Sequence, residues 1–352
     1  MPKQKPKFDP QNQHSQKKLV IFSKYLQRYL DVVGKKYPSI RVYDMFAGKG
    51  KYDDNPGSAV RAVDIIKEYR ARSNCDVRLY LNEKDAANYN SLCQNIELQD
   101  HQEWLTCTQE NANDMIAKYL SCRYKSRQLF FLDPFGYTQI NKETVDDICA
   151  HPQSECLWFI PVSNIGRFAS IADQVNGLAR FMQEYDIPPG IYQGKNITWE
   201  WLTILKKAFV SSYPKHYVAV AKLQAPHGVY ALYFMTRHIR GLDKFVEVVD
   251  AVAEQSQNQL KLFTSTEDND ETRQFLSVER SNKEVYEWML KQGRVPKSAR
   301  KILEEMEERG EINVRPTDAT PQRRKGDFYL GYKHYPEKIP PKIMIQSTHV
   351  GN

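Results

Sequence analysis

The chain reads Ile40-Arg-Val-Tyr-Asp-Met-Phe-Ala-Gly-Lys-Gly-Lys-Tyr52 where a β-rich run meets a glycine-containing loop. The run Ile40–Phe46 predicts a strand, and a helical pattern follows from Ser58. Gly48 and Gly50 let the backbone turn tightly and approach a ligand with no Cβ in the way. Because an open α/β sheet binds ligands at the carboxyl ends of its strands, this loop is a candidate binding site. An ordinary strand-to-helix turn would use the same residues.

Short β-rich runs alternate with helical runs around this loop and beyond it. Five such repeats predict a parallel sheet with helices on both faces, and two later runs separated by the segment 224–228 predict an antiparallel hairpin. This arrangement is similar to the sheet of class I methyltransferases, so we expect an α/β, Rossmann-like fold. The expected strands are Ile40–Phe46, Val77–Leu81, Trp104–Thr108, Gln128–Leu132, Cys156–Val162, Tyr217–Leu223 and Val229–Arg237, and the expected helices are His14–Lys36, Ser58–Arg72, Asp85–Leu98, Asn113–Cys122, Lys142–Ala150 and Asp243–Ala253.

The C-terminal region predicts a small α+β domain of the winged-helix type. Helices are expected at Asn282–Gln292 and Pro296–Arg309, followed by a hairpin that pairs Glu311–Arg315 with Phe328–Tyr332. A polar, acidic stretch at 264–273 marks the boundary before this domain. The expected organisation is a basic disordered arm at 1–13, a Rossmann-like methyltransferase-fold domain at 14–262, a linker at 263–280, the winged helix at 281–335 and a tail at 336–352.

The excess positive charge of the chain lies at its N-terminus. Residues 1–36 hold nine Lys or Arg and two Asp, which accounts for the whole net charge of +7. This segment, which includes Lys17 and Lys18, suits contact with nucleic acid, although a solubilising tail has the same composition. Arg323, Arg324 and Lys325 in the expected wing loop also suit phosphate contact. The acidic second half of the preceding helix would repel phosphates and favours a protein partner instead.

Composition and spacing exclude several classes of protein. The mean hydropathy is −0.64, and no stretch reaches the roughly 18–20 apolar residues of a membrane span. The six cysteines are far apart, so neither a zinc site nor a disulfide framework is expected. The nucleophile elbow, the phosphate-binding GxxxxGK[ST] loop and HExxH do not occur. We expect a cytoplasmic protein without a metal site or membrane contact.

Acidic residues end the first two expected strands. Asp44 closes the first strand, and Glu83 closes the second, where a carboxylate would accept hydrogen bonds from the two hydroxyls of a ribose. Helix capping or simple solvation explains each of them singly. The segment Asn111-Ala-Asn-Asp114 follows the third strand, where Asn113 and Asp114 could meet an adenine amino group, although capping of the next helix by this segment is the simpler interpretation.

The fourth expected strand ends in Phe130-Phe-Leu-Asp-Pro-Phe-Gly136. Asp133-Pro134-Phe135 resembles the (D/N)PP(Y/F) motif of amino-methyltransferases, in which the acidic or amide side chain binds the target nitrogen and an aromatic ring stacks on the base. Here the second proline is missing and the aromatic residue stands one place early. A rigid β-turn started by Pro134 explains the same residues.

Taken together, these segments resemble the three-Cys-motif partner family, TcmP. The matching stretches are His14…Lys17-Lys18-Leu19…Tyr25-Leu26…Tyr29-Leu30, Asp44–Tyr52 with Gly57-Ser58, Asn82-Glu83-Lys84-Asp85 and Phe131-Leu-Asp-Pro-Phe-Gly136. The resemblance covers about 14–335. It implies a methyltransferase-like Rossmann fold with a winged helix, and a phage-type partner protein with three clustered cysteines similar to radical-SAM proteins.

Two functions fit these observations. The first is an S-adenosylmethionine-dependent methyltransferase, or a related transferase, that acts on nucleic acid or together with the three-Cys partner. Its catalytic residues would be Asp133, Pro134 and Phe135, and its cofactor site would use Asp44, Phe46, Gly48, Gly50, Tyr52, Glu83, Asn113 and Asp114. The second is a non-catalytic adaptor that uses the same fold and the winged helix to bind a partner protein or DNA.

Overall fold

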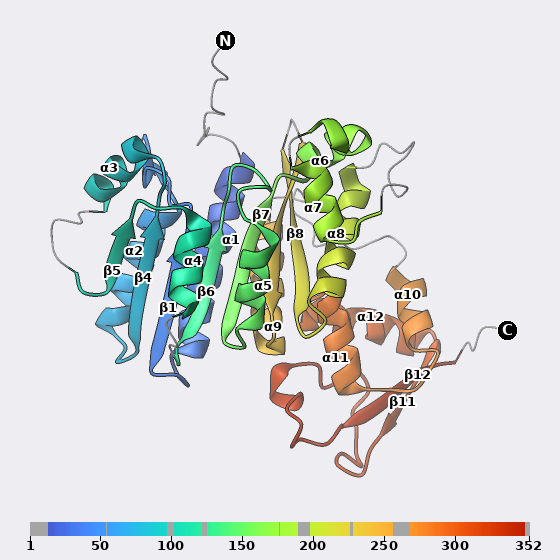
Figure 1. Ribbon diagram of the computed structural model, residues 1–352. Coiled ribbons are helices and arrows are strands. Elements are labelled where there is room, and N and C mark those ends of the chain that lie inside the picture. Colours follow the sequence, from blue (N-terminus) through green and yellow to red (C-terminus); the bar gives the residue numbers. More distant parts are fainter. Residues whose placement is uncertain are drawn as a thin grey trace.

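A computed structural model describes residues 13–53, 55–96, 102–121, 125–175, 177–188, 198–225, 228–255 and 268–348. A seven-stranded sheet forms its centre, in the order β5-β4-β1-β6-β7-β9-β8 (Figure 1). The first five strands of this order run parallel, whereas β9 is antiparallel to both β7 and β8. The strands are β1 (Ser39–Asp44), β4 (Asp76–Asn82), β5 (Leu105–Thr108), β6 (Arg127–Leu132), β7 (Ser154–Ile160), β8 (Tyr217–Ala225) and β9 (Gly228–Thr236). The α/β, Rossmann-like fold expected from the sequence is confirmed, including its terminal hairpin.

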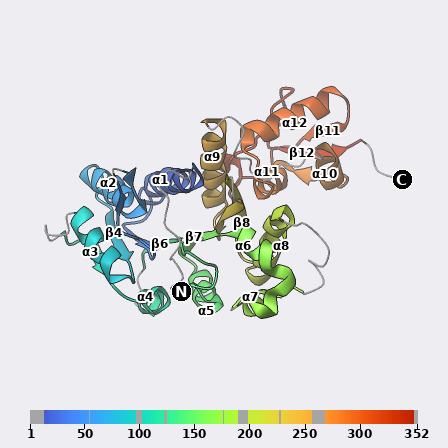
Figure 2. The ribbon, with the colours of Figure 1, turned by 90° about the horizontal axis from the view of Figure 1, so that it is seen from above.

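Helices cover both faces of this sheet and create two separate cores, because alternate residues of each strand point to opposite sides. In β1, Val42 belongs to one core and Tyr43 to the other. Figure 2 shows α1 (Gln13–Val33), α2 (Ser58–Ala71) and α9 (Ile239–Gln255) along the first face. The second face carries α4 (Ala112–Ser121), α5 (Lys142–Ala150), α6 (Val162–Phe168), α7 (Leu178–Glu184) and α8 (Thr198–Ser212), while α3 (Ala86–Asn95) follows β4 and the 3₁₀ helix Ala169–Gln174 follows α6.

An apolar stripe along α1 holds this helix to the sheet. Phe22 is fully buried and stacks on Phe131 of β6, with 4.1 Å between ring centroids. One turn further along, the Tyr25 hydroxyl donates a 2.5 Å hydrogen bond to buried Glu155 of β7. The first turn of α1 thereby reaches the carboxyl edge of the sheet, and its last turn reaches the amino edge.

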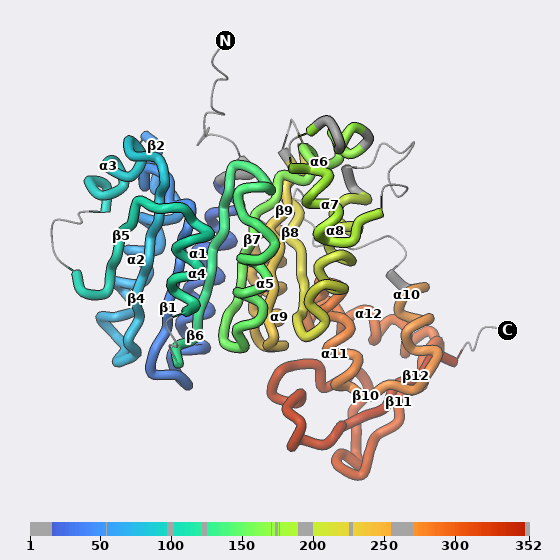
Figure 3. The backbone as a smooth tube through the Cα atoms, viewed as in Figure 1, coloured from blue at the N-terminus to red at the C-terminus, as the bar shows by residue number. Residues whose placement is uncertain are grey.

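The C-terminal unit packs against α9 (Figure 3). Its buried residues continue the first core. Its elements are α10 (Asp268–Phe275), β10 (Arg280–Ser281), α11 (Asn282–Lys291), α12 (Pro296–Glu308), β11 (Ile312–Pro316), a 3₁₀ turn at Tyr332–His334 and β12 (Ile343–Ser347). The three strands form a sheet of order β10-β12-β11. Helix α11 begins with a capping box between Ser281 and Glu284, which explains why it starts where the sequence predicts.

The predicted C-terminal hairpin is wrong in its second strand. β11 pairs with β12, in a stretch expected to be a tail, and not with 328–332. Phe328 and Leu330 are buried, but the intervening Tyr329 has a φ of 51°, which a strand does not accommodate. Ile343 and Ile345 instead alternate inward and satisfy the period of a strand.

Helix α10 lies within the range expected to be a linker, and the residue after it, Leu276, is fully buried and accepts a 2.7 Å hydrogen bond from the Ser347 amide. The expected arm at 1–13 falls almost wholly outside the described residues. Within the described part of the chain, none of the helices has the length and apolar character needed to cross a bilayer.

Candidate functional site

The loop after β1 is fixed between the two neighbouring strands. The Met45 amide donates to the Phe131 carbonyl at 3.3 Å, and the Ala47 amide donates to the Asn82 carbonyl at 3.0 Å. These bonds continue the pairing of β1 past its last residue. The chain then turns back through Gly48 and Gly50, whose φ angles are 62° and 81°, in the region that favours glycine. The loop is therefore a defined structure at the carboxyl edge of the sheet.

A short hairpin closes this loop. β2 (Lys51–Tyr52) pairs with β3 (Asn55–Pro56), and the Gly57 amide donates a 2.7 Å bond to the Gly50 carbonyl. The Tyr52 hydroxyl lies where a Cβ on Gly48 would stand, so no other residue fits at that position without displacing the ring. Burial raises the pKa of Tyr52. The sequence-predicted Gly48, Gly50 and Tyr52 thus come together in one wall.

Asp44 occupies the last position of β1 and is fully buried. Its Oδ1 atom accepts a 3.3 Å bond from the Phe46 amide, whereas its Oδ2 atom has no hydrogen-bond partner within the described residues. Burial raises the pKa of Asp44 to about 7. The nearby charge of Asp133 acts in the same direction, whereas the Ser58 side chain, the Phe46 amide and the charge of Lys18 act against it. A buried carboxylate oxygen without a partner is costly, and this cost falls when a cationic or hydrogen-bonding ligand arrives.

Glu83, just past the end of β4, braces the glycine loop from the neighbouring strand. Its Oε2 atom accepts a 3.0 Å bond from the Gly48 amide, and its Oε1 atom accepts a 2.7 Å bond from the Asp85 amide. Burial raises the pKa of Glu83. Each carboxylate oxygen carries a second lone pair, so Glu83 retains the capacity to accept hydroxyl donors while it holds the loop.

Asp133 and Phe135 follow β6 at the same edge of the sheet. Phe135 is 55% exposed, which is unusual for a large aromatic residue. Asp133 is held by Lys18 of α1, whose Nζ lies 2.6 Å from both carboxylate oxygens. Lys18 is only 4% exposed and also lies 4.1 Å from the centroid of the Phe159 ring. The carboxyl edge thus gathers Asp44, Glu83, Asp133 and a buried lysine.

Lys18 is the site residue that the sequence interpretation placed elsewhere. The structure puts it beside Asp133 and not on a nucleic-acid-binding arm, whereas its neighbour Lys17 is half-buried. The helical period contained the signal, because Lys18 stands four residues before Phe22 and seven before Tyr25 on the buried stripe.

Asn113 and Asp114 are residues of α4, and the hydrogen bonds of the Asn113 side-chain oxygen connect α4 to the start of α5. The Asn113 side-chain oxygen accepts bonds from the Asn141 amide at 3.2 Å and from the Thr144 hydroxyl at 2.8 Å. Asp114 is exposed in the first turn of α4, and the capping oxygen comes from Asn111, which accepts a 2.9 Å bond from the Asn113 amide. The capping interpretation of this segment is confirmed for Asn111.

The basic triplet of the C-terminal unit is divided by its contacts. Arg323 is held by Glu307 of α12 through bonds of 2.7 and 2.9 Å and is nearly buried. Arg324 and Lys325 are exposed. Only the last two of the three predicted phosphate contacts are therefore available on the surface. Within the described residues, no group of three or more His, Cys, Asp or Glu side chains is placed to hold a metal ion.

The strand order and the glycine loop at its centre define a Rossmann-like α/β protein with a sheet similar to that of class I methyltransferases. No family model matches the chain, and no curated protein matches its sequence.

The chain has a weak likeness to a number of solved structures, among them the following two. Trm1 from Pyrococcus horikoshii, in complex with S-adenosyl-L-methionine, is 16% identical, with 66% of this chain and 58% of that chain covered and a TM-score of 0.39. An O-methyltransferase from Bacillus cereus, in complex with SAH, is 11% identical, with 65% and 92% covered and a TM-score of 0.36. The chain spans less than two thirds of Trm1. The fold assignment rests on the strand order itself.

Proposed function

We propose that this protein is an S-adenosylmethionine-dependent methyltransferase that acts on an amino group of a nucleic-acid base. The observation that carries this proposal is the buried Oδ2 atom of Asp44, which lacks a partner among the described residues and stands beside the glycine loop that Glu83 braces. An unsatisfied carboxylate at the end of the central strand and a second carboxylate at the end of the next strand suit a ligand with an ammonium group and a ribose.

In this proposal each residue has a defined role. Asp44 faces the ammonium group of the amino-acid part of the ligand, and Gly48 and Gly50 allow the backbone to lie against it. Glu83 accepts hydrogen bonds from the ribose hydroxyls. S-adenosylmethionine supplies a methyl group on a sulfonium, which an amine attacks without strong acid–base assistance. The protein contributes chiefly alignment and exclusion of water.

The acceptor would meet Asp133 and Phe135. The exposed ring of Phe135 supports stacking on a base, and the Asp133 carboxylate supports acceptance of a hydrogen bond from the attacking amine. Since Lys18 engages both oxygens of Asp133, the amine shares this carboxylate with the lysine. The missing second proline of the motif leaves the choice of base open within this class.

Replacing Glu83 by Ala should weaken S-adenosylmethionine binding by about 1.5–3 kcal/mol, the usual value of hydrogen bonds to a charged group. The loss has two sources, because the ribose acceptor and the brace on the Gly48 amide disappear together. Calorimetric titration of the purified protein measures it. Glu83→Gln, which keeps one acceptor oxygen, should lose less affinity; unchanged affinity in both variants would exclude Glu83 from the site.

We propose that the C-terminal unit is a winged helix that contacts the phosphate backbone of the substrate. The order of α10, β10, α11, α12, β11 and β12 supports this assignment, and exposed Arg324 and Lys325 lie in the long connection between the last two strands.

Charge reversal at Arg324 and Lys325 should make nucleic-acid binding less sensitive to salt. Each lost phosphate contact should reduce the slope of log affinity against log salt concentration by roughly 0.7–0.9. Fluorescence anisotropy with a labelled oligonucleotide at several salt concentrations measures the slope. The double variant Lys67→Glu with Lys118→Glu, at exposed positions of α2 and α4, reverses the same number of charges and should leave the slope unchanged. An equal change in the control would point to net charge alone.

We further propose a partner protein with three clustered cysteines, on the strength of the resemblance to the TcmP family. A non-catalytic adaptor is the second candidate function, and the Lys18–Asp133 ion pair favours it, because the lysine engages both oxygens of the carboxylate that the acceptor would use. Co-purification with a candidate three-Cys protein, with methyl transfer measured in the same preparation, separates the two functions.

A further inference from the structure

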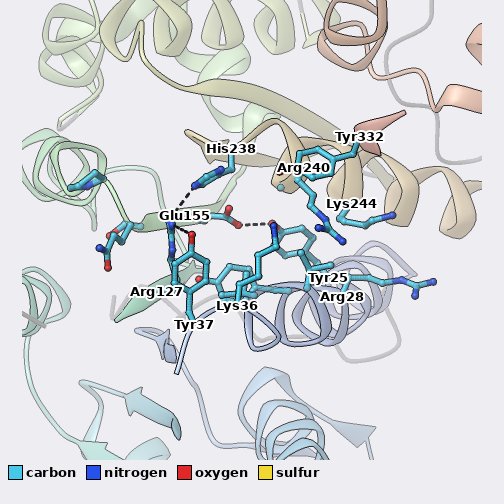
Figure 4. A pocket seen from close by; sticks show the side chains of 17 residues that line it. Tyr25, Arg28, Lys36, Tyr37, Arg127, Glu155, His238, Arg240, Lys244 and Tyr332 are labelled. Carbon is cyan, nitrogen blue, oxygen red and sulfur yellow. Dashed lines mark hydrogen bonds between the residues drawn. The ribbon is translucent and has the colours of Figure 1, made fainter. Parts of the chain in front are cut away.

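A cavity of about 80 Å³ lies at the opposite edge of the sheet from the glycine loop (Figure 4). Arg127 is the first residue of β6, whereas Asp133 follows its last residue, so a whole strand of about 20 Å separates the cavity from the candidate catalytic residues. Residues of α1, the start of α9 and Tyr332 of the C-terminal unit also line it. The volume accommodates several water molecules or one small anion.

Three cationic side chains from different segments meet at this cavity. Lys36 comes from the turn after α1, Arg127 from β6 and Arg240 from α9, and none of the three forms an ion pair with another described residue. By contrast, Arg28 and Lys244 at the rim share Glu247. Arg127 donates to the Tyr37 hydroxyl, and its Nε atom is buried without a hydrogen-bond partner in the described part of the chain.

The one carboxylate that lines the cavity is engaged by two hydroxyl groups. Glu155 accepts a 2.5 Å bond from the Tyr25 hydroxyl and a 2.8 Å bond from the Thr236 hydroxyl. Burial raises the pKa of Glu155, and these two hydrogen bonds and the charge of Arg127 act in the opposite direction. His238 lies 3.2 Å from Arg127, and desolvation together with the charges of Arg127 and Lys36 lowers its pKa. The cavity therefore gathers three cationic side chains and a histidine around one carboxylate that already accepts two hydrogen bonds.

We propose that this cavity binds a phosphate group, at a site separate from the methyl-transfer site. Guanidinium groups suit tetrahedral oxyanions because their parallel N–H donors match two oxygens at once. Arg240 lies 4.9 Å from the ring centroid of Tyr332, so a bound phosphate would connect the sheet to the C-terminal unit. The same chemistry is presented by free phosphate, by a nucleotide and by the 5′ end of an oligonucleotide.

Inorganic phosphate is the first probe, added to the full-length protein at constant ionic strength adjusted with chloride. We expect phosphate to raise the unfolding temperature, and Arg127→Gln or Arg240→Gln to weaken phosphate binding about ten- to a hundredfold. Arg180→Gln removes the same charge from the exposed surface of α7 and should bind phosphate as the unchanged protein does. No phosphate-dependent shift, or equal effects in all three variants, would overturn the proposal.

The pKa of His238, followed by NMR in the unchanged protein, tests the site even if the arginine variants do not fold. Sulfate keeps its charge across the pH range in which a histidine titrates. Its binding should raise the pKa of His238 by offsetting the neighbouring cations. The groups that face this histidine are Arg127 of β6, Lys36 and Tyr37 after α1, Glu155 of β7 and Arg240 of α9. A pKa of His238 that is the same in sulfate and in chloride contradicts the site.

The source of the phosphate is identified by comparison of ligands. A 5′-mononucleotide that competes with inorganic phosphate identifies a small-molecule source. A 5′-phosphorylated oligonucleotide that competes better than its 5′-hydroxyl counterpart identifies a nucleic-acid end. Both results support a phosphate site. S-adenosylmethionine titration measures binding at the other edge of the sheet. Failure of phosphate binding and failure of S-adenosylmethionine binding can therefore be distinguished.

Discussion

Replacing Asp133 by Ala is expected to lower the rate of methyl transfer by about 10²–10³-fold, the effect of removing one preorganised polar group from a catalytic site. S-adenosylmethionine affinity should stay nearly unchanged, because Asp44, Gly48 and Glu83 form the ligand wall without Asp133. The physical reason is positional: Asp133 follows β6 beside exposed Phe135, where the acceptor would lie. The measurement is transfer of labelled methyl groups to pooled DNA and RNA oligonucleotides, together with calorimetry.

Asp133→Asn is the matched control for this change. It keeps an oxygen that accepts a hydrogen bond from the amine, as the (D/N)PP(Y/F) motif permits, and it removes the charge that holds Lys18. Activity that persists in the Asn variant and disappears in the Ala variant supports an acceptor-binding role. Both variants should lose some stability, because Lys18 stays buried without its charged partner. Loss of cofactor affinity in both variants, measured where both remain folded, would show instead that Asp133-Pro134-Phe135 is a structural turn.

Replacing Lys18 by Met should lower the free energy of unfolding by about 3 kcal/mol. The ion pair with Asp133 is 2.6 Å long and nearly buried, and removal of one partner leaves a charge of the other sign with little solvent. This value is at the lower end of the range for buried ion pairs because the Asp133 side chain is still 15% exposed to solvent. Chemical denaturation monitored by circular dichroism measures it.

Lys17→Met controls for this change, since it removes the same charge one position away on the half-buried side of α1. We expect little loss in that variant. A double variant, Lys18→Met with Asp133→Leu, should recover stability, because both charges are then absent. Equal destabilisation by Lys17→Met and Lys18→Met would contradict a specific ion pair.

Hydrophobic periodicity sufficed to predict the sheet and most of its helices. Runs such as Val77–Leu81 alternate between two cores, and this alternation is readable without long-range information. The C-terminal hairpin was not predictable in the same way. Phe328 and Leu330 have the spacing of a strand, but the left-handed conformation of Tyr329 ends any ladder there. Such a conformation depends on the surrounding packing and has no clear signature in a residue that is neither Gly nor Asn.

The candidate site was predictable in its backbone and less so in its charges. The glycines and the strand-end positions of Asp44 and Glu83 follow from local patterns. The ion pair between Lys18 and Asp133 joins residues 115 positions apart, and no local pattern reports it. The basic triplet is a second example, because an ion pair with Glu307 of α12 removes Arg323 from the exposed surface. Net charge located the arm but did not distinguish a buried lysine from a solvated one.

The pH dependence of S-adenosylmethionine binding tests the central claim most directly. Since the pKa of Asp44 is raised to about 7, this carboxyl carries a proton below that pH in the free protein. A bound ammonium group favours the ionised form, so binding should release a proton, and affinity should rise with pH by up to about tenfold per unit below pH 7 and then level off. Calorimetry of the purified protein, alone and after addition of a candidate three-Cys protein, in two buffers of different ionisation enthalpy measures both effects. Binding with proton release supports the account, whereas no binding of S-adenosylmethionine in either preparation would contradict it.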